Sequence, residues 1–231
     1  MFLKIVDNPN LHLFANSHCS AIFNYDFSFD DIFDSLTEEY AFIRNFDKFS
    51  QKRKIEFLAG RYCAREAFKK IDNANKQIVI DVNDDRSPRW PEGFIGSITH
   101  AKNFASAIVF PSSKVTSIGI DSELIISLTR ATELSDMILT VNELNLFRKN
   151  FELNVLVTAF FSAKESIFKC FYSITFTMFD FKDVEIFFLC PYMGKFKFRL
   201  LKDISSRFKK GHEYSGNVVI DKVYVHTAVK I

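Results

Sequence analysis

Cysteine is scarce in this sequence, and its few cysteines are badly placed for a metal site. The chain of 231 residues has four of them, and no two have the spacing of a metal-binding pair. A chain of this length can bury a core without disulfides, so we expect a reducing, cytoplasmic setting. The four are Cys19, Cys63, Cys170 and Cys190.

The sequence also lacks a strong net charge and a long apolar run. Its formal net charge is +2, so no overall field favours nucleic acid or a membrane surface. No apolar run approaches the length of a membrane span, and Asp7 interrupts the short apolar run at the N-terminus. We therefore expect neither a transmembrane segment nor a signal peptide. With 48% apolar residues, the chain can form one large domain or two small ones.

A helix is predicted for residues 160–172, FFSAKESIFKCFY, which contain neither Gly nor Pro. One acidic and three aromatic residues share a face of this helix: Phe161, Glu165, Phe168 and Tyr172. A carboxylate in a half-buried aromatic stripe is costly unless a cation compensates it. Lys164, Lys169 or a metal ion can supply that cation. The simpler alternative is a helix with a satisfied Glu–Lys pair.

A second helix, basic at its start, is predicted from about residue 51 to residue 71, with Ser50 as its N-cap. Arg53, Arg61 and Arg65 fall roughly on one side of it. Cations in the first turn oppose the helix dipole, so Arg53 is misplaced unless an anion lies nearby. This pattern points to phosphate binding, although a solvated basic face explains it as well.

A pair of acids follows an apolar strand. Residues 115–120 lead into Asp121 and Glu123, which point to the same side because successive strand residues alternate. Two desolvated acids on one side repel each other, and a divalent cation resolves both the repulsion and the desolvation. A D-x-E pair at a strand end is, however, also common without any function.

The remaining segments are assigned from alternation and turn residues. Strands are expected within residues 1–25, 77–82, 94–98, 105–110 and 181–231, with a loop at 83–93 that holds the only Trp and a turn at 211–216. Two helical pieces are expected in 127–150, the second with a capping box formed by Thr140 and Glu143. Residues 26–49 are acidic and aromatic and give no clear assignment. His100 follows the strand at 94–98, and a lone His is usually structural or solvent-facing.

Two stretches of the chain resemble each other. FLAGRYCAREAF at 57–68 and FFSAKESIFKCF at 160–171 align without gaps, and each precedes strand-like segments. This favours two related α+β halves that meet near residues 111–116, although two amphipathic helices can also match by chance.

Four motifs occur along the chain: RKIEFLAGRYCAR at 53–65, WPEGFIGSITH at 90–100, GIDSE at 119–123 and FSAKESIFK at 161–169. In order and spacing they resemble the Sfp-type 4′-phosphopantetheinyl transferases, in particular the branch that serves enterobactin-type siderophore synthases. The resemblance implies an α+β fold of two similar halves in a pseudo-twofold arrangement, with coenzyme A between them. Residues 1–113 would contact the 3′-phosphate and nucleotide, and residues 114–231 would hold the metal site and catalytic helix.

The same resemblance implies a reaction. A serine hydroxyl of an apo acyl or peptidyl carrier protein attacks the β-phosphate of coenzyme A, phosphopantetheine is transferred, and adenosine 3′,5′-bisphosphate leaves. Charge on the leaving oxygens must be neutralised, and Mg²⁺, or Mn²⁺, held by carboxylates does this. The resemblance makes Asp121, Glu123 and Glu165 the metal ligands. Glu165 would also be the general base, and Lys164 and Lys169 would bind the diphosphate.

The first half would bind the rest of coenzyme A. Three residues match positions that hold the 3′-phosphate in the family: Arg53, Arg61 and His100. Arg86 would lie over the nucleotide, and Ser97 and Thr99 would add contacts. The chain departs from the family at Val82, where relatives commonly carry a basic residue, and at Phe161, where some carry Trp. It also lacks the glycines that some relatives have after the last motif, which affects the channel for the pantetheine arm.

The expected partners are coenzyme A and apo carrier domains, including those of nonribosomal peptide and siderophore synthesis. We expect a monomer that binds no nucleic acid. Two alternatives remain: a Mg²⁺-dependent nuclease, and a non-catalytic module that binds coenzyme A or a nucleotide. A nuclease site needs Glu-x-Lys on one strand, whereas Lys164 and Glu165 are adjacent on a predicted helix. Binding alone does not require three acids, so metal-dependent turnover separates these alternatives.

Overall fold

The computed structural model describes residues 3–6, 18–23, 31–43, 46–71 and 78–231. The chain divides into two units, Met1–Val115 and Thr116–Ile231. The sequence predicts this boundary between residues 113 and 114. Among the described helices, none is long and apolar enough to cross a membrane.

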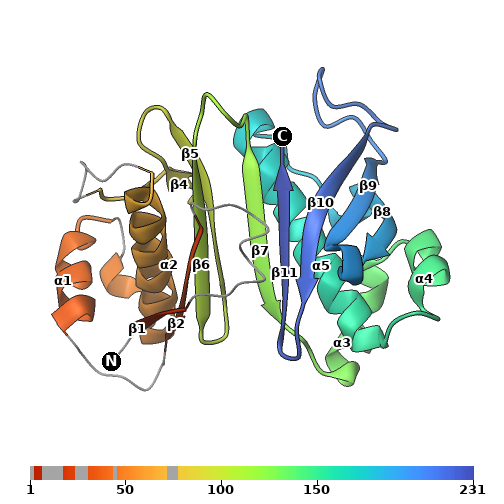
Figure 1. The fold of residues 1–231 in the computed structure, drawn as a ribbon, viewed down its shortest axis with the longest axis horizontal. Coiled ribbons are helices and arrows are strands. Elements are labelled where there is room, and N and C mark those ends of the chain that lie inside the picture. Colours follow the sequence, from red (N-terminus) through yellow and green to blue (C-terminus); the bar gives the residue numbers. More distant parts are fainter. Residues whose placement is uncertain (1–2, 7–17, 24–30, 44–45, 72–77) are drawn as a thin grey trace. The chain divides into compact units, whose positions relative to one another are not determined.

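The first unit is built on an antiparallel sheet of four strands (Figure 1). In order across the sheet they are β1 (Leu3–Val6), β2 (His18–Phe23), β6 (Phe104–Pro111) and β5 (Phe94–Ala101). The predicted hairpin of β5 and β6 is confirmed, and His100 lies opposite Ala105 in it. β5 runs past its predicted end at Ile98, so the turn is confined to Lys102 and Asn103.

Helix α2 (Gln51–Lys69) packs on this sheet. Ser50 caps it as predicted, because its Oγ accepts a hydrogen bond from the backbone N of Arg53 at 3.2 Å. The buried apolar side of the helix joins the core of the unit with Ile55, Leu58, Ala59, Cys63, Ala64, Ala67 and Phe68. A Cβ at Gly60 would meet Cγ2 of Ile98 at 2.8 Å, so glycine lets the helix lie close to β5.

Two short elements occupy part of the segment 26–49 that the sequence left unassigned. They are α1 (Asp31–Glu39) and the 3₁₀ turn η2 (Phe46–Lys48). Aromatic residues around them pack on α2: the ring of Phe57 lies 5.6 Å from that of Tyr40 and 5.8 Å from that of Phe46, between centroids. An aromatic cluster therefore fills the core where the sequence shows no helical or strand period.

The strand predicted at 77–82 is wrong for most of its described length. Residue 77 lies outside the described residues, and only β3 (Asp81–Val82) is extended, paired with β4 (Pro88–Arg89). The backbone of Ile80 instead binds side chains. Its N–H donates to the hydroxyl of Tyr40 at 3.1 Å, and its carbonyl accepts from Nε of Arg61 at 2.8 Å. Those contacts replace strand pairing at this residue.

The second unit has an antiparallel sheet of five strands (Figure 1). In order across the sheet they are β7 (Ile118–Leu124), β11 (Tyr224–Lys230), β10 (Glu213–Ile220), β9 (Lys195–Leu200) and β8 (Val184–Cys190). Short 3₁₀ turns, η3 (Phe181–Asp183) and η4 (Pro191–Met193), flank β8. The strands predicted after residue 181 are thus confirmed, and β7 and β8 are the two edges of the sheet.

One turn was misplaced in the sequence-based prediction. The turn expected at 211–216 ends earlier, because β10 begins at Glu213. The last predicted strand is also divided into two, β10 and β11, by a turn that begins at Asp221. The carboxylate of Asp221 makes this turn, because its Oδ1 accepts hydrogen bonds from the backbone N of Val223 and of Tyr224, both at 2.7 Å.

Three helices accompany this sheet: α3 (Leu128–Ile138), α4 (Val141–Phe147) and α5 (Leu153–Thr175). The capping box predicted for α4 is confirmed, with Thr140 and Glu143 bonded reciprocally. Helix α5, which extends the predicted helix at both ends, packs on β7 and β11. Gly119 permits this packing, because a Cβ there would overlap the carbonyl oxygen of Ser166 and lie 2.6 Å from the N of Cys170.

Each unit therefore combines an antiparallel sheet with one long helix, and the predicted α+β class is confirmed. The long helices α2 and α5 contain the two stretches that resemble each other in sequence. The pseudo-twofold relation between the units stays a prediction.

Candidate active site

Three acidic side chains of the second unit come from β7 and α5. Asp121 and Glu123 alternate with Ser122 on β7, so they share one face of the strand. That face is turned to α5, because Thr227, which lies opposite Asp121 on β11, bonds the hydroxyl of Ser162 at 2.9 Å. The predicted pairing of the two strand acids is thus realised on the side that carries the helix.

Lys169 of α5 lies among these acids. Its Nζ donates to Oδ1 of Asp121 at 2.6 Å and to the carbonyl of Ile120 at 3.2 Å. Burial opposes the positive charge of Lys169, yet Asp121, Glu165 and Glu123 together raise its pKa above the ordinary value. The ammonium group is thus the counter-charge of an acidic cluster, and it pairs with an acid 48 positions away.

The two glutamates of this cluster, Glu123 and Glu165, hold their protons unusually well. Burial raises the pKa of Glu123 to about 8, with further contributions from the charges of Asp121 and Glu165, while Lys169 opposes the rise. Burial also raises the pKa of Glu165, the charge of Asp121 adds to this, and Lys169 again opposes it. The site therefore has more carboxyl groups than its single lysine could neutralise if all of them were ionised.

The donor set suits a hard divalent ion. Carboxylate oxygens are the preferred protein ligands of Mg²⁺, and an ion among them would offset the burial, and the repulsion by neighbouring acids, that raise both glutamate pKa values. Among the described residues, no three His, Cys, Asp or Glu side chains are already grouped so that they could hold one metal ion. The metal-ligand assignment of Asp121, Glu123 and Glu165 fits chemically and stays a prediction.

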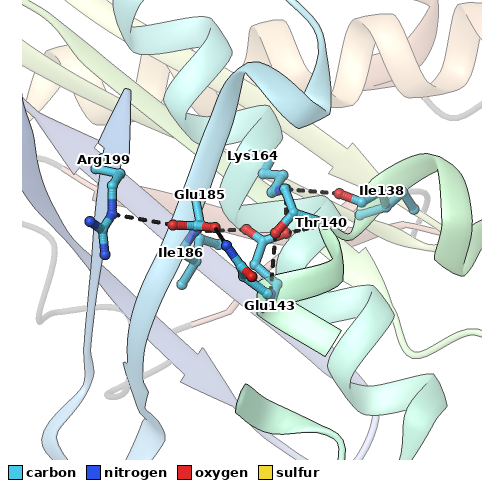
Figure 2. A network of polar contacts seen from close by, with 8 residues as sticks. Ile138, Thr140, Glu143, Lys164, Glu185, Ile186 and Arg199 are labelled. Carbon is cyan, nitrogen blue, oxygen red and sulfur yellow. Dashed lines mark hydrogen bonds and ion pairs between the residues drawn. The ribbon is translucent and has the colours of Figure 1, made fainter. Parts of the chain in front are cut away.

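Lys164, predicted to bind diphosphate, is turned into the interior of the unit (Figure 2). Its side chain is 1% exposed, and its Nζ lies 2.8 Å from Oε2 of Glu143 and 2.8 Å from the carbonyl of Ile138. The ammonium group is thus already bound by two acceptors. Its neighbour Glu165 lines a cavity of about 200 Å³, with Phe168 and Phe179 in the wall.

In the first unit, Arg53 and His100 lie together at the surface. Nη1 of Arg53 is 2.9 Å from Nε2 of His100, and the two side chains are 48% and 37% exposed. Glu56 is near both: its Oε2 lies 3.8 Å from the guanidinium and 3.9 Å from Nδ1 of the histidine. Glu56 therefore supplies an anion near the misplaced Arg53, and its spacing of three residues along the helix was a signal for it.

Arg61 has a different environment. It is buried, its Nε binds the carbonyl of Ile80, and its guanidinium lies 4.5 Å from the ring centroid of Phe57. Burial lowers its pKa to about 10, the charge of Arg53 lowers it further, and Tyr40 and Asp81 oppose the change. Arg61 thus supports the chain at Ile80, whether or not it also contacts a phosphate.

The other predicted nucleotide contacts divide between surface and interior. Arg86 is exposed and has a φ of 69°, in a turn where its N–H donates to the carbonyl of Asn83 at 2.9 Å. Ser97 and Thr99 are buried on β5 and lie on the face opposite to that of His100. Their roles with a nucleotide stay predictions.

Two family models match the chain. Residues 38–110 match the 4′-phosphopantetheinyl transferase N-terminal domain, and residues 117–223 match the 4′-phosphopantetheinyl transferase superfamily. The first match contains the basic helix and the β5–β6 hairpin. The second contains all three acids, both lysines and helix α5.

Curated relatives are named as 4′-phosphopantetheinyl transferases or as components of enterobactin synthase. Enterobactin synthase component D of Escherichia coli K12 is 38% identical over 120 residues, 52% of this chain and 55% of the relative. The same component of Salmonella typhi is 35% identical over 122 residues, 52% of this chain and 49% of the relative. The 4′-phosphopantetheinyl transferase PptT of Mycobacterium tuberculosis is 28% identical over 166 residues, 67% of this chain and 68% of the relative.

The chain spans about half the length of the enterobactin synthase components that it matches. The two family matches nevertheless lie one in each unit of the structure and together take in both long helices and the acidic cluster. The chain belongs to the 4′-phosphopantetheinyl transferase superfamily.

Proposed function

We propose that the protein transfers 4′-phosphopantetheine from coenzyme A to a serine of an apo acyl or peptidyl carrier protein and releases adenosine 3′,5′-bisphosphate. The observation that carries this proposal is the cluster of Asp121, Glu123, Glu165 and Lys169 on β7 and α5. The cluster lies within the region that the superfamily model matches. It combines excess carboxylate charge with one ammonium group, as transfer from a diphosphate requires.

A metal ion would be held by Asp121, Glu123 and Glu165, and Mg²⁺, or Mn²⁺, would supply charge neutralisation at the diphosphate oxygens. The chain itself contributes a base and a fixed cation. The Glu165 carboxylate accepts the proton of the attacking serine hydroxyl, and the burial that raises its pKa makes it a stronger base than an exposed glutamate. The ammonium group of Lys169 stabilises charge on the departing phosphate.

The basic pair of the first unit is the proposed site for the 3′-phosphate. Arg53 and His100 present two exposed nitrogen-bearing side chains at one place, beside an open hollow lined in part by Lys52 and Lys102. A phosphate bound there would either lie beside Glu56 or displace Glu56 from Arg53. Arg86, Ser97 and Thr99 complete the proposed nucleotide contacts.

The proposed partners are carrier domains, and the siderophore synthase relatives suggest nonribosomal peptide synthesis as the setting. We propose that the enzyme acts in the cytoplasm as a monomer.

Intact mass spectrometry tests this function. An apo carrier protein incubated with the chain, coenzyme A and Mg²⁺ should gain the mass of one phosphopantetheine group, and EDTA should prevent the gain. Glu165→Gln should lower kcat by about 10²–10⁴-fold, because the base is lost and one metal ligand is weakened. Glu133→Gln, at an exposed carboxylate of α3, is the matched control and should transfer at the normal rate. Binding of coenzyme A without any transfer would leave only a binding module.

A further inference from the structure

A buried carboxylate joins two helices and a strand of the second unit (Figure 2). Glu143 of α4 is fully buried. Its Oε1 accepts from the backbone N of Ile186 at 2.7 Å, and its Oε2 accepts from the N of Thr140 at 2.7 Å and from Nζ of Lys164 at 2.8 Å. One carboxylate thus holds the start of α4, the edge strand β8 and helix α5.

The lysine completes the junction. Nζ of Lys164 also donates to the carbonyl of Ile138, at the end of α3. A second polar link runs alongside, because Nδ2 of Asn142 donates to Oε1 of Glu185 at 3.0 Å, and Glu185 forms an ion pair with Arg199 at 3.2 Å (Figure 2). The side chain of Lys164 therefore reaches the ends of two helices and, through Glu143, a strand.

Such a pair is a poor source of stability. Burial raises the pKa of Glu143 and lowers the pKa of Lys164, so each group pays for its desolvation before the attraction is counted. Two apolar side chains of similar size would generally stabilise the fold as well or better. What the polar contacts add is direction, because a hydrogen-bonded ammonium group fixes its helix in rotation more narrowly than an apolar contact does.

The rotation of α5 matters because Glu165 is the next residue after Lys164. Successive residues point about 100° apart around a helix, so a turn of α5 that moves one side chain moves the other. The ammonium group of Lys164 lies in the buried junction, whereas Glu165, which lines the cavity together with Lys164, interacts electrostatically with Asp121 and Lys169.

We propose that Glu143 is a positioning residue that acts through Lys164 to aim Glu165 at Asp121 and Glu123. The proposal rests on the proposed function, and it replaces the diphosphate contact expected of Lys164 with a structural one. Neither Glu143 nor Lys164 touches the substrate. Both set the geometry of the acid that does.

Mn²⁺ affinity measured without coenzyme A, by electron paramagnetic resonance, separates the two roles of Lys164. A lysine that contacts only the diphosphate influences the metal-binding affinity of the free protein through its charge alone. Through charge alone, Lys164→Met would strengthen Mn²⁺ binding and Glu143→Gln would weaken it. If both residues position Glu165, each variant should weaken Mn²⁺ binding by about tenfold, as loss of a residue that orients a metal ligand generally does.

A double variant keeps the test valid if the single variants fail to fold. Glu143→Gln with Lys164→Met removes both buried charges and keeps a side-chain oxygen that can accept from the backbone N of Ile186 or Thr140, so it should be less destabilised than Lys164→Met, which leaves Glu143 without its cation. Its Mn²⁺ affinity should nevertheless be about tenfold lower. Lys209→Met is the matched control, because Lys209 forms an exposed ion pair with Asp203 in the same unit. Unchanged Mn²⁺ affinity in the folded double variant overturns the proposal.

Transfer kinetics add an independent measurement. Positioning predicts a lower kcat for Lys164→Met with little change in the KM for coenzyme A. A direct diphosphate contact instead predicts a higher KM and an Mn²⁺ affinity that is unchanged or higher, and this result would overturn the proposal. Failure of the proposed function would give a different result from either role of Lys164. In that case the unaltered protein would bind Mn²⁺ and transfer nothing, while the effects of the variants on Mn²⁺ binding would still decide the role of Glu143.

Discussion

At the scale of single residues, Glu123 links the stability of the protein to pH. Its pKa is about 8 in the folded chain and close to 4.5 when unfolded, so the folded state keeps a proton that the unfolded state loses between those values. The free energy of unfolding of the metal-free protein should therefore fall as pH rises through this window. Urea unfolding in EDTA at several pH values measures this fall, and Glu123→Gln should reduce it.

The control for this experiment is Glu133→Gln, which removes a carboxylate at an exposed position of α3. An equally steep fall in Glu123→Gln and in the unaltered protein would show that another group holds the proton.

His226 should lower the free energy of unfolding as pH falls, whereas Glu123 lowers it as pH rises. Burial lowers its pKa to about 4, against the charges of Asp221 and Asp121, and one ring nitrogen lies 2.9 Å from the hydroxyl of Ser122. As pH falls, His226 binds a proton near pH 6.5 in the unfolded chain but only near pH 4 in the folded chain. Stability that is present above pH 6.5 should thus be lost as pH falls toward 4.

Thermal unfolding between pH 4 and 7 checks this, with His226→Asn as the variant whose profile should be flatter. His212→Asn is the control, because His212 is exposed. A profile for His226→Asn as steep as that of the unaltered protein would assign the acid sensitivity to other groups.

Sequence reasoning located the acids of the site better than its cations. Strand alternation was enough to place Asp121 and Glu123 on one side. It could not decide between Lys164 and Lys169, because both lie close to Glu165 along the helix. Packing decides: Lys169 meets Asp121, 48 positions away, and Lys164 meets Glu143, 21 positions away. The capping role of Glu143 was visible from local spacing, and its buried lysine partner was not.

At the scale of elements, β7 and α5 approach each other closely at Gly119. Any side chain there would collide with the backbone of α5 near Ser166 and Cys170. Gly119→Ala should therefore destabilise the protein by about 3 kcal/mol, through overpacking that the two rigid elements relieve only by moving apart. Denaturant unfolding measures the loss, and Ser215→Ala, at an exposed position of β10, should cost far less.

A displaced β7 would also carry Asp121 and Glu123 away from α5, so the same substitution should weaken Mn²⁺ binding. A variant with normal stability and normal metal affinity would contradict the close contact at Gly119.

Helices and strands with a clear period were predictable, and turns made by single side chains were not. The helices capped by Ser50 and Thr140 follow from local signals. The turn at Asp221 depends on one carboxylate binding two backbone N–H groups, within a stretch that otherwise reads as continuous strand. Ile80 fails as a strand residue because Tyr40 and Arg61, from elsewhere in the chain, take its backbone groups.

At the scale of the whole molecule, each unit has a core of its own, and the only Trp belongs to the first. Trp90 packs against the core of that unit and lies across Gly96 of β5. Its fluorescence therefore reports on the first unit, whereas circular dichroism reports on both. In Gly119→Ala, we expect the dichroism transition to split while the fluorescence transition keeps its midpoint.

Coincident transitions by both probes in that variant would instead show that the two units unfold as one. The unaltered protein, measured by the same two probes, is the reference.

The bond between Glu143 and Ile186 has a consequence for behaviour in concentrated solution. β8 is an edge strand, and edge strands offer backbone groups to strands of other molecules. At Ile186 the outward N–H is already taken by a carboxylate from within the same fold. A strand of another molecule could pair with β8 at Ile186 only by displacing the buried carboxylate of Glu143. At this residue β8 therefore resists the edge-to-edge aggregation to which open edges are prone.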